Sequence, residues 1–260
     1  MKRLTFIVPL RIESEKRLWN LEFLLTRLRA RYQNRIIVVE NNAEPKLTKA
    51  FIDKYNIQYI FENTKDYPEW SRPRMANKGL VLSDTEISVI QDTDMIVDYD
   101  YFDKYIINNI DKFDYFFGPK ELYEHSGDLL APDGPLEPER AKFKFVRYSH
   151  PGGIHVAKTE MFIKAGGMSE YFNNYAWDDV EIGWRMAKLK YRVEGSRYPG
   201  IMLHLAHPRP PTLQGKSWWA GKDENGEYFK IIARFTKEEL EKYVLNELKP
   251  MLDKHKRIMD

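Results

Sequence analysis

Ile87-Ser88-Val89-Ile90-Gln91-Asp92-Thr93-Asp94 is the stretch that decides how this sequence folds. Its first five residues are mostly apolar and predict a short buried strand. Two carboxylates, Asp92 and Asp94, follow at the strand end, where a ligand crevice normally opens in an α/β sheet. Carboxylate oxygens suit Mg²⁺ or Mn²⁺ better than soft metals, and such a cation can hold a diphosphate. Taken alone, the triplet is equally consistent with an ordinary turn.

Strand-like and helix-like segments alternate along the first hundred residues. The predicted strands are residues 4–10, 35–40, 57–61 and 87–91, and the predicted helices are residues 16–31, 45–55 and 71–82. This alternation is typical of an α/β protein with a mainly parallel sheet and helices on both faces. Ligands of such sheets bind at the carboxyl ends of the strands. Four polar residues follow such ends: Arg11, Glu40, Asn41 and Asp92.

The second half of the sequence is less regular. Residues 113–118 predict a strand, and residues 119–146 and 208–228 predict long loops rich in proline and glycine. Residues 180–189 predict a helix. Thr236-Lys237-Glu238-Glu239 is a capping box that opens a C-terminal helix. No linker or repeat interrupts the sequence, so we expect one domain.

Composition and charge restrict the classes of function. The 260 residues are 43% hydrophobic, which supports one large globular domain, and their formal net charge of +2 argues against nucleic acid as a whole-surface partner. The absence of cysteine excludes disulfides and thiolate metal sites. We expect no transmembrane segment and no signal peptide, hence a cytoplasmic protein. Peripheral membrane contact through the helix at residues 237–259 stays open, as does the oligomeric state.

A second motif lies between residues 152 and 185. It consists of Gly152-Gly153, Phe162, Gly166-Gly167-Met168, Trp177-Asp178-Asp179 and Arg185. In this order and spacing it resembles the C-terminal region of β-galactosyltransferases, a region shared by family-2-type glycosyltransferases of the GT-A fold. Three N-terminal segments agree with the resemblance, which covers roughly residues 4–207: Pro9-Leu10-Arg11, the Arg-x-x-x-x-Asn-x-Gly pattern from Arg72 to Gly79, and Asp92-Thr93-Asp94 as an Asp-x-Asp motif.

The resemblance implies a GT-A (Rossmann-like) α/β fold in a single domain over residues 1–260. This domain would comprise a nucleotide-binding half (1–100), an acceptor and catalytic half (101–235) and a C-terminal helix (236–260). The implied activity is metal-dependent sugar transfer from a nucleotide-sugar, with UDP-sugars as the leading donors. The acceptor would be a saccharide, polysaccharide or glycolipid, as in polysaccharide biosynthesis. Charge builds on the leaving diphosphate, so a divalent cation and nearby arginines should stabilise it.

Donor-binding roles follow from the same resemblance. Asp94 is expected to bind the metal, and Asp92 to reach the ribose or the metal. Arg72 or Arg74 is expected to contact the diphosphate, and Trp177 to stack on a sugar. The residues expected to bind the nucleotide-sugar are Pro9, Arg11, Glu40, Asn41, Arg72, Arg74, Asn77, Asp92, Thr93, Gly153 and Trp177.

The acid pair carries the expected catalysis. Asp179 matches the family's general base, which takes the proton of the attacking hydroxyl, and Asp178 is expected to orient a sugar. One carboxylate base implies direct displacement, with inversion at the anomeric carbon. An N-terminal helix cap is the competing interpretation of both acids. The sequence departs from the family in having Asp-Asp instead of Glu-Asp and in its lead-in, Tyr175-Ala176-Trp177.

Histidines near residue 205 complete the expected metal site. Relatives place a metal-binding histidine in the segment that here contains His204 and His207. The distance from the acid pair favours His204, with His207 as the alternative or a second ligand. With Asp94, and Asp92 as a further candidate, such a histidine would complete a mixed oxygen and nitrogen site suited to Mn²⁺, or alternatively Mg²⁺. His125, His150 and His155 have no comparable support. Trp218 and Trp219 are expected to lie in a loop that closes over the donor.

Three other classes of function remain open. A nucleotidyltransferase would share the fold, but it ordinarily shows a glycine-rich loop after the first strand, and residues 10–14 contain no glycine. A metal-dependent hydrolase could use Asp94, His204 and His207. A non-catalytic carbohydrate- or nucleotide-binding protein would fit the aromatic residues, but it would not require the acid pair.

Overall fold

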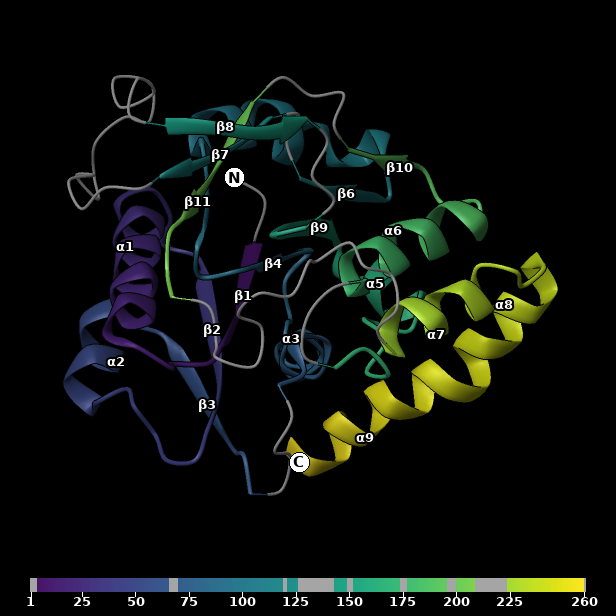
Figure 1. Cartoon of the computed structure of the whole chain (residues 1–260), viewed down its shortest axis with the longest axis horizontal. Coiled ribbons are helices and arrows are strands. Elements are labelled where there is room, and N and C mark those ends of the chain that lie inside the picture. Colours follow the sequence, from purple (N-terminus) through teal and green to yellow (C-terminus); the bar gives the residue numbers. More distant parts are fainter. Residues whose placement is uncertain are drawn as a thin grey trace.

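The computed structural model describes residues 4–65, 70–118, 121–125, 143–148, 152–173, 177–195, 200–208 and 224–259. A seven-stranded mixed sheet lies at its centre (Figure 1). From edge to edge its strands are β10 (Val193–Glu194), β6 (Tyr115–Phe117), β9 (Ile154–Lys158), β4 (Ile87–Gln91), β1 (Leu4–Leu10), β2 (Arg35–Asn42) and β3 (Gln58–Asn63). The predicted parallel sheet is confirmed for β4, β1, β2 and β3, whereas β9 runs antiparallel to β4 and β6.

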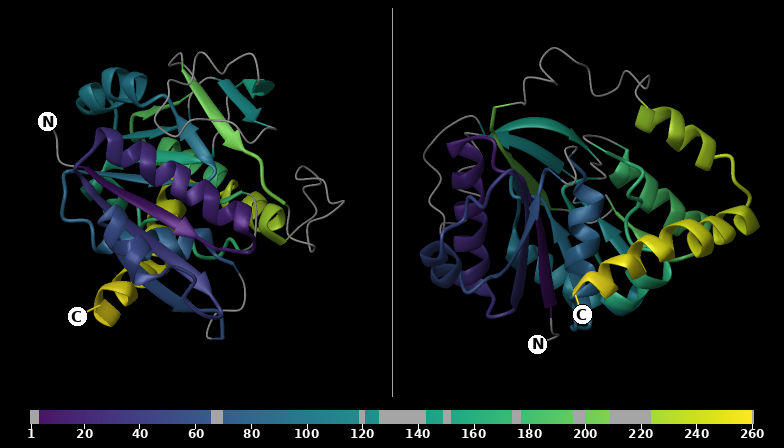
Figure 2. Two further views of the ribbon diagram at one scale, coloured as in Figure 1. Left: turned by 90° about the vertical axis from the view of Figure 1, so that its left-hand side faces the viewer. Right: turned by 90° about the horizontal axis from the view of Figure 1, so that it is seen from below.

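Helices pack against both faces of this sheet, as predicted (Figure 2). In order they are α1 (Glu15–Arg31), α2 (Lys49–Tyr55), α3 (Arg72–Val81), α4 (Tyr99–Tyr101), the π-helical turn η1 (Phe102–Ile106), the 3-10 helix η2 (Ile107–Lys112), α5 (Thr159–Lys164), α6 (Asp178–Lys188), α7 (Glu224–Ile232), α8 (Lys237–Tyr243), the π-helical turn η5 (Val244–Leu248) and α9 (Lys249–Met259). None of these described helices is long and apolar enough to cross a membrane.

The alternation of side chains along β1 explains the two layers. Phe6 joins the apolar cluster that contains the buried leucines of α1, while the next residue, Ile7, joins the cluster of α3 and α5. Gly79 permits the close approach of α3, because a Cβ there would lie 2.3 Å from Ile7 Cγ2. The sheet thus places the carboxyl ends of β1, β2 and β4 between the two helical layers.

A second sheet corrects the prediction of one long loop over residues 119–146. Its strands are β5 (Met95–Val97), β11 (Ile201–Leu205), β7 (Glu121–His125) and β8 (Phe143–Tyr148), in that order. The pattern of β7 hides this strand, because only Leu122 and His125 of its five residues are buried. Its hydrogen-bonding partners lie about twenty and eighty residues away along the chain, so no local signal marks it.

The predicted capping box at the start of the C-terminal helical segment is confirmed. Thr236 caps α8, and Glu239 completes the predicted capping box. The predicted loop over residues 208–228 is wrong at its end, since α7 already begins at Glu224. Trp218, Trp219 and the Tyr175-Ala176 lead-in lie outside the described residues, so the expected closing loop stays a prediction.

Candidate active site and metal centre

The turn after β4 is shaped by hydrogen bonds from two directions. The Asp92 amide donates to the Gly153 carbonyl at 2.9 Å, and the Gln91 side-chain amide donates to the Met95 carbonyl at 2.7 Å. Gly153 has φ +88°, and a Cβ there would lie 2.6 Å from the Met95 side chain. Only glycine adopts that backbone conformation readily, so the close approach of β9 to the Asp92–Asp94 turn requires a glycine at residue 153.

Strand β11 brings both predicted histidines to Asp94. β11 runs antiparallel to β5, which sets His204 opposite Met95, and the Leu205 amide donates to the Asp94 carbonyl at 2.7 Å. His207 Nε2 lies 2.9 Å and His204 Nε2 3.8 Å from Asp94 Oδ2. Among the described residues, these three form the group that could hold a metal ion, with ligand atoms all within 4.8 Å of one another. We call them the metal triad.

The donor set of the metal triad fits Mn²⁺ better than Mg²⁺. His207 Nδ1 lies 2.9 Å from the Pro208 carbonyl and donates to it, which directs Nε2 toward Asp94 Oδ2. This is how proteins orient a histidine that binds a metal. One carboxylate with two imidazoles is a mixed donor set suited to Mn²⁺ and less suited to Mg²⁺, which prefers oxygen. Asp92, the fourth predicted ligand, is not part of this group.

A cation that the sequence did not indicate also faces the metal triad. Arg17 Nη1 lies 2.6 Å from Asp94 Oδ2. Burial alone would raise the pKa of Asp94, but Arg17 and the two histidines outweigh burial and hold that pKa well below its usual value. Asp94 also raises the pKa of His204 against the effect of burial. Ser14, which caps α1 through the Arg17 amide, is the sequence signal that places Arg17 at the carboxyl end of β1.

Arg72 gathers the predicted acids into one group. Its Nη1 donates to Asp178 Oδ2 at 2.9 Å and to Asp179 Oδ1 at 2.7 Å, and its Nε donates to Asp92 Oδ1 at 2.5 Å. We call Asp92, Asp178, Asp179 and Arg72 the acid cluster. Asp92 therefore faces Arg72, while Asp94 faces the histidines. Asp178 and Asp179 occupy the first turn of α6, where the helix dipole favours negative charge, and the N-cap residue Trp177 makes no side-chain capping hydrogen bond.

Three carboxylates around one guanidinium repel each other. Burial, together with repulsion from Asp179 and Asp94, raises the pKa of Asp92 to about 7 despite the attraction of Arg72. Burial and repulsion from Asp179 likewise raise the pKa of Asp178 to about 6. Perturbed carboxylates with a stated physical cause are typical of functional sites, since a protein built only for stability would avoid this crowding.

His155, which the sequence did not support, lies against the acid cluster. Its Nε2 is 2.6 Å from Asp179 Oδ1, and its Nδ1 is 2.5 Å from the Tyr115 hydroxyl. Burial lowers the pKa of His155, although Asp179 acts in the opposite direction. The signal in the sequence was its place two residues after Gly153, on the strand that borders β4.

The residues expected around the nucleotide lie at the ends of β1 and β2. Both oxygens of Glu40 accept hydrogen bonds, from the Lys46 amide at 3.0 Å and the Tyr59 hydroxyl at 2.7 Å. The Asn41 side chain donates to the Glu62 carbonyl at 3.4 Å.

Three further residues expected to bind the nucleotide lie at or just after the ends of β1 and β4. Pro9 pairs with Val39 inside the sheet. Arg11 lies 3.6 Å from Glu13 and is partly exposed, and Thr93 is buried between the two acids of the turn.

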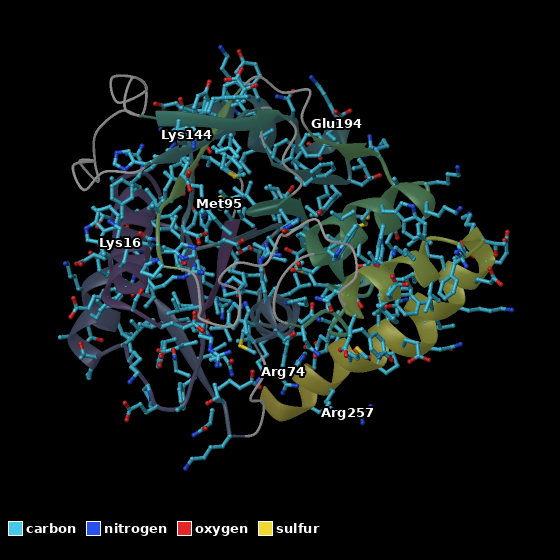
Figure 3. The ribbon with its side chains drawn as sticks, viewed as in Figure 1. Lys16, Arg74, Met95, Lys144, Glu194 and Arg257 are labelled. Carbon is cyan, nitrogen blue, oxygen red and sulfur yellow. The ribbon has the colours of Figure 1, made fainter. Side chains whose placement is uncertain are left out.

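Arg74 and Asn77 lie outside the acid cluster. The Arg74 guanidinium pairs with Glu62 Oε1, which also contacts Lys78 at 2.5 Å, and in Figure 3 Arg74 lies well below Met95. The Asn77 side chain donates to the Met168 carbonyl and accepts from the Met168 amide, both at 2.8 Å. It therefore fastens α3 to the chain just after Gly167. Within the predicted Arg72-to-Gly79 pattern, Arg72 thus belongs to the acid cluster, whereas Arg74 and Asn77 contribute to packing.

Trp177 begins α6 in a left-handed conformation, with φ +76°. Its ring stacks on Phe229 of α7 with centroids 5.2 Å apart. Within the described residues its Nε1 is buried and has no hydrogen-bond partner. A buried indole normally finds a partner, so Trp177 combines a packing role with a donor that a ligand could satisfy.

Comparison with known proteins supports the fold alone. No protein-family model matches the chain, and no curated protein matches it in sequence. The structure of GalNAc-T7 with UDP, GalNAc and Mn²⁺ is similar, with a TM-score of 0.62 and 12% identity over 98% of this chain and 55% of that one. This chain therefore spans about half the length of that protein.

A mutant of a Drosophila β1,4-galactosyltransferase 7, in complex with manganese, UDP-Gal and xylobiose, is also similar. Its TM-score is 0.50 and its identity 14%, over 91% of this chain and 81% of that one. Together the two likenesses show that the chain has the GT-A fold, as the resemblance predicted.

Proposed function

We propose that this protein is a metal-dependent, inverting glycosyltransferase of the family-2 type that transfers a sugar from a UDP-sugar to a saccharide, polysaccharide or glycolipid acceptor. One observation carries the proposal: the turn after β4 directs Asp94 to two histidines and Asp92, two residues earlier, to Arg72 and the acid pair of α6. A metal triad and an acid cluster thus share one strand end. UDP and Mn²⁺ in both similar structures support the choice of donor and ion.

The metal triad and arginines would bind the donor diphosphate. A Mn²⁺ or Mg²⁺ ion held by Asp94, His204 and His207 would stabilise the charge that develops on the leaving diphosphate. The buried Arg72 and the partly buried Arg17 lie next to the two groups, and either can donate to phosphate oxygens. Glu40, Asn41, Pro9 and Arg11 would contact the base and ribose. Arg74, bound to Glu62, would act through packing.

The acid pair would act on the acceptor and sugar. Asp179 takes the proton of the acceptor hydroxyl as its oxygen bonds to the anomeric carbon, and the bond from that carbon to the diphosphate breaks with its electron pair. Asp178 holds a sugar hydroxyl, and the Trp177 Nε1 donates to a sugar oxygen. A base on the side opposite the leaving group inverts the anomeric centre.

A screen of nucleotide-sugars tests the proposal. Release of UDP and protection against melting are measured with and without Mn²⁺, in the presence of saccharide acceptors, for the full chain and for Asp94→Ala. We expect Mn²⁺-dependent binding that Asp94→Ala abolishes, and a glycoside product. Full turnover in excess chelator would contradict the metal requirement. Phosphoester hydrolysis without nucleotide-sugar binding would instead indicate a hydrolase, and sugar binding without turnover a non-catalytic protein.

A further inference from the structure

A buried hydrogen-bonded chain leads from the central sheet to the proposed base. β6 and β9 are antiparallel neighbours, with Tyr115 opposite Ala157 and Phe117 opposite His155. Tyr115 and His155 are therefore diagonal neighbours on one face of the sheet, and both are fully buried. That face meets the first turn of α6, so the chain runs from the Tyr115 hydroxyl through the His155 ring to Asp179 Oδ1.

The direction of each hydrogen bond in this chain follows from the chemistry of its members. Burial keeps the pKa of the Tyr115 hydroxyl far above its usual value, so it stays protonated and donates to His155 Nδ1. Burial also lowers the pKa of His155, so its ring is neutral and carries one proton. Since Nδ1 accepts, that proton is on Nε2, and Nε2 donates to Asp179 Oδ1. The ring has no lone pair left to act as a base.

We infer that His155 is a positioning residue, which holds Asp179 in orientation and in its charged form for the transfer step, with Tyr115 fixing the required tautomer. The inference rests on the proposed function. The proton of the acceptor hydroxyl goes to Asp179 and never to His155, while the new glycosidic bond forms and the bond to the diphosphate breaks. His155 contributes because a donor to a carboxylate stabilises the charge that a base needs.

Packing alone does not require these residues. Tyr115 and His155 lie in the layer that holds Ile7, Ile90 and Phe162, where apolar side chains would fill the same space without buried polar groups. Five side chains from four elements and one strand end face Asp179: Arg72 of α3, Asp178 of α6, Asp92 after β4, His155 of β9 and Tyr115 of β6. His155 is the neutral donor among them that contacts the carboxylate, so its removal leaves the formal charge of the cluster unchanged.

Three variants of the full chain test the kinetic role. His155→Met removes the donor, His155→Gln keeps an N–H near the position of Nε2, and Tyr115→Phe removes the hydroxyl that sets the tautomer. We expect His155→Met to lower kcat about tenfold or more, the rate equivalent of one hydrogen bond to a charged group. The KM for the UDP-sugar should stay within about twofold, because the donor nucleotide lies on the metal side.

The pH profile separates positioning from general damage to the fold. Loss of the Nε2 donor makes the Asp179 carboxylate easier to protonate, so the acidic limb of kcat should move to higher pH in His155→Met. His155→Gln should restore most of kcat and of the profile, and Tyr115→Phe should lie between wild type and His155→Met. An unchanged kcat and pH profile in a folded His155→Met variant would overturn the inference.

A measurement without turnover keeps the two proposals separate. Nitrogen-15 NMR of histidine in the full chain should show His155 as the neutral Nε2–H tautomer, and Asp179→Asn should shift that resonance selectively among the six histidines. If the protein gives this result but transfers no sugar, the proposed function is wrong, while the contact between His155 and Asp179 is confirmed. A Nδ1–H tautomer or a charged ring in an active enzyme would overturn the inference alone.

Discussion

Arg17 Nη1 lies 2.6 Å from Asp94 Oδ2, the same oxygen that His207 Nε2 approaches at 2.9 Å. The guanidinium of Arg17 therefore places a positive charge next to the carboxylate that a divalent ion would need. Arg17 comes from α1, seventy-seven residues before Asp94, and the relationship makes the metal site and the first helix interdependent.

The first prediction concerns metal binding. Arg17→Ala should bind Mn²⁺ more tightly than wild type in the absence of nucleotide, because the variant removes a like charge and frees an oxygen of Asp94. Isothermal titration calorimetry measures this directly. Arg31→Ala is the matched control, since Arg31 lies at the other end of α1 and pairs with Asp100 and Asp103. Weaker Mn²⁺ binding in Arg17→Ala would instead mean that Arg17 supports the ligand.

The second prediction concerns the base. Asp179→Asn keeps the shape of the side chain and an oxygen that can accept from Arg72 and His155, but it cannot take a proton. We expect UDP-sugar binding within a few-fold of wild type and a kcat lower by about 10²–10⁴, the range typical of general-base loss. Steady-state kinetics, with circular dichroism to verify folding, measures both. A normal turnover number would assign the proton to another residue.

The third prediction links the acid cluster to stability. The pKa of Asp178 is about 6 in the folded protein and 3.8 in its reference state, so the folded state binds this proton more tightly. Ionised Asp178 therefore destabilises the fold above pH 6, and the penalty disappears below about pH 4. Asp178→Asn should raise the melting temperature by several degrees at pH 7.5, on the order of 2 kcal/mol, while it lowers activity.

The same melting experiment contains its own checks. The stabilisation by Asp178→Asn should shrink as the pH falls from 6 toward 4, because wild-type Asp178 then becomes neutral as well. Asp53→Asn is the matched control: this carboxylate is exposed on α2 beside Lys49, and its loss should change the melting temperature little. A variant that melts lower than wild type at pH 7.5 would show that the ion pair with Arg72 outweighs the repulsion.

The fourth prediction concerns stereochemistry. With one carboxylate base, the acceptor hydroxyl attacks opposite the departing diphosphate, so an α-linked UDP-sugar should give a β-glycoside. Proton NMR of the anomeric coupling in the product decides the outcome. An α-glycoside would remove both the direct displacement and the role proposed for Asp179, since retention needs a different arrangement of groups at the anomeric carbon.

The parallel half of the fold was predictable because its signals are local. The apolar runs that become β1, β2 and β4 are buried almost throughout, while the edge strand β3 is mostly half-buried. Helices follow β1, β2 and β3 along the chain. Burial of a whole strand produces a continuous apolar run that can be recognised without its neighbours. β7 and β8 were missed because half-exposed strands that pair only with distant segments have no such run.

Within the candidate site, residue types were predictable and their partners were not. The carboxylates of the β4 turn and of α6, His204 of β11 and His207 just after it were all selected from the sequence, and the structure brings them to one region. Arg17 and His155 were not selected, because their partners lie seventy-seven and twenty-four residues away. Nothing in a stretch of sequence records which buried donor will meet a given carboxylate.

Asp92 and Asp94 show which features of the site depend on the sequence and which depend on the tertiary structure. The sequence by itself determined that two carboxylates end a buried strand, because strand burial and its termination depend on adjacent residues. The tertiary structure alone decided that Asp94 faces two histidines and Asp92 faces Arg72. That division depends on the register of β11 against β5 and on the close approach of Gly153. In a buried site the nearest partner sets the charge and orientation of an acid, and only the folded chain supplies that partner.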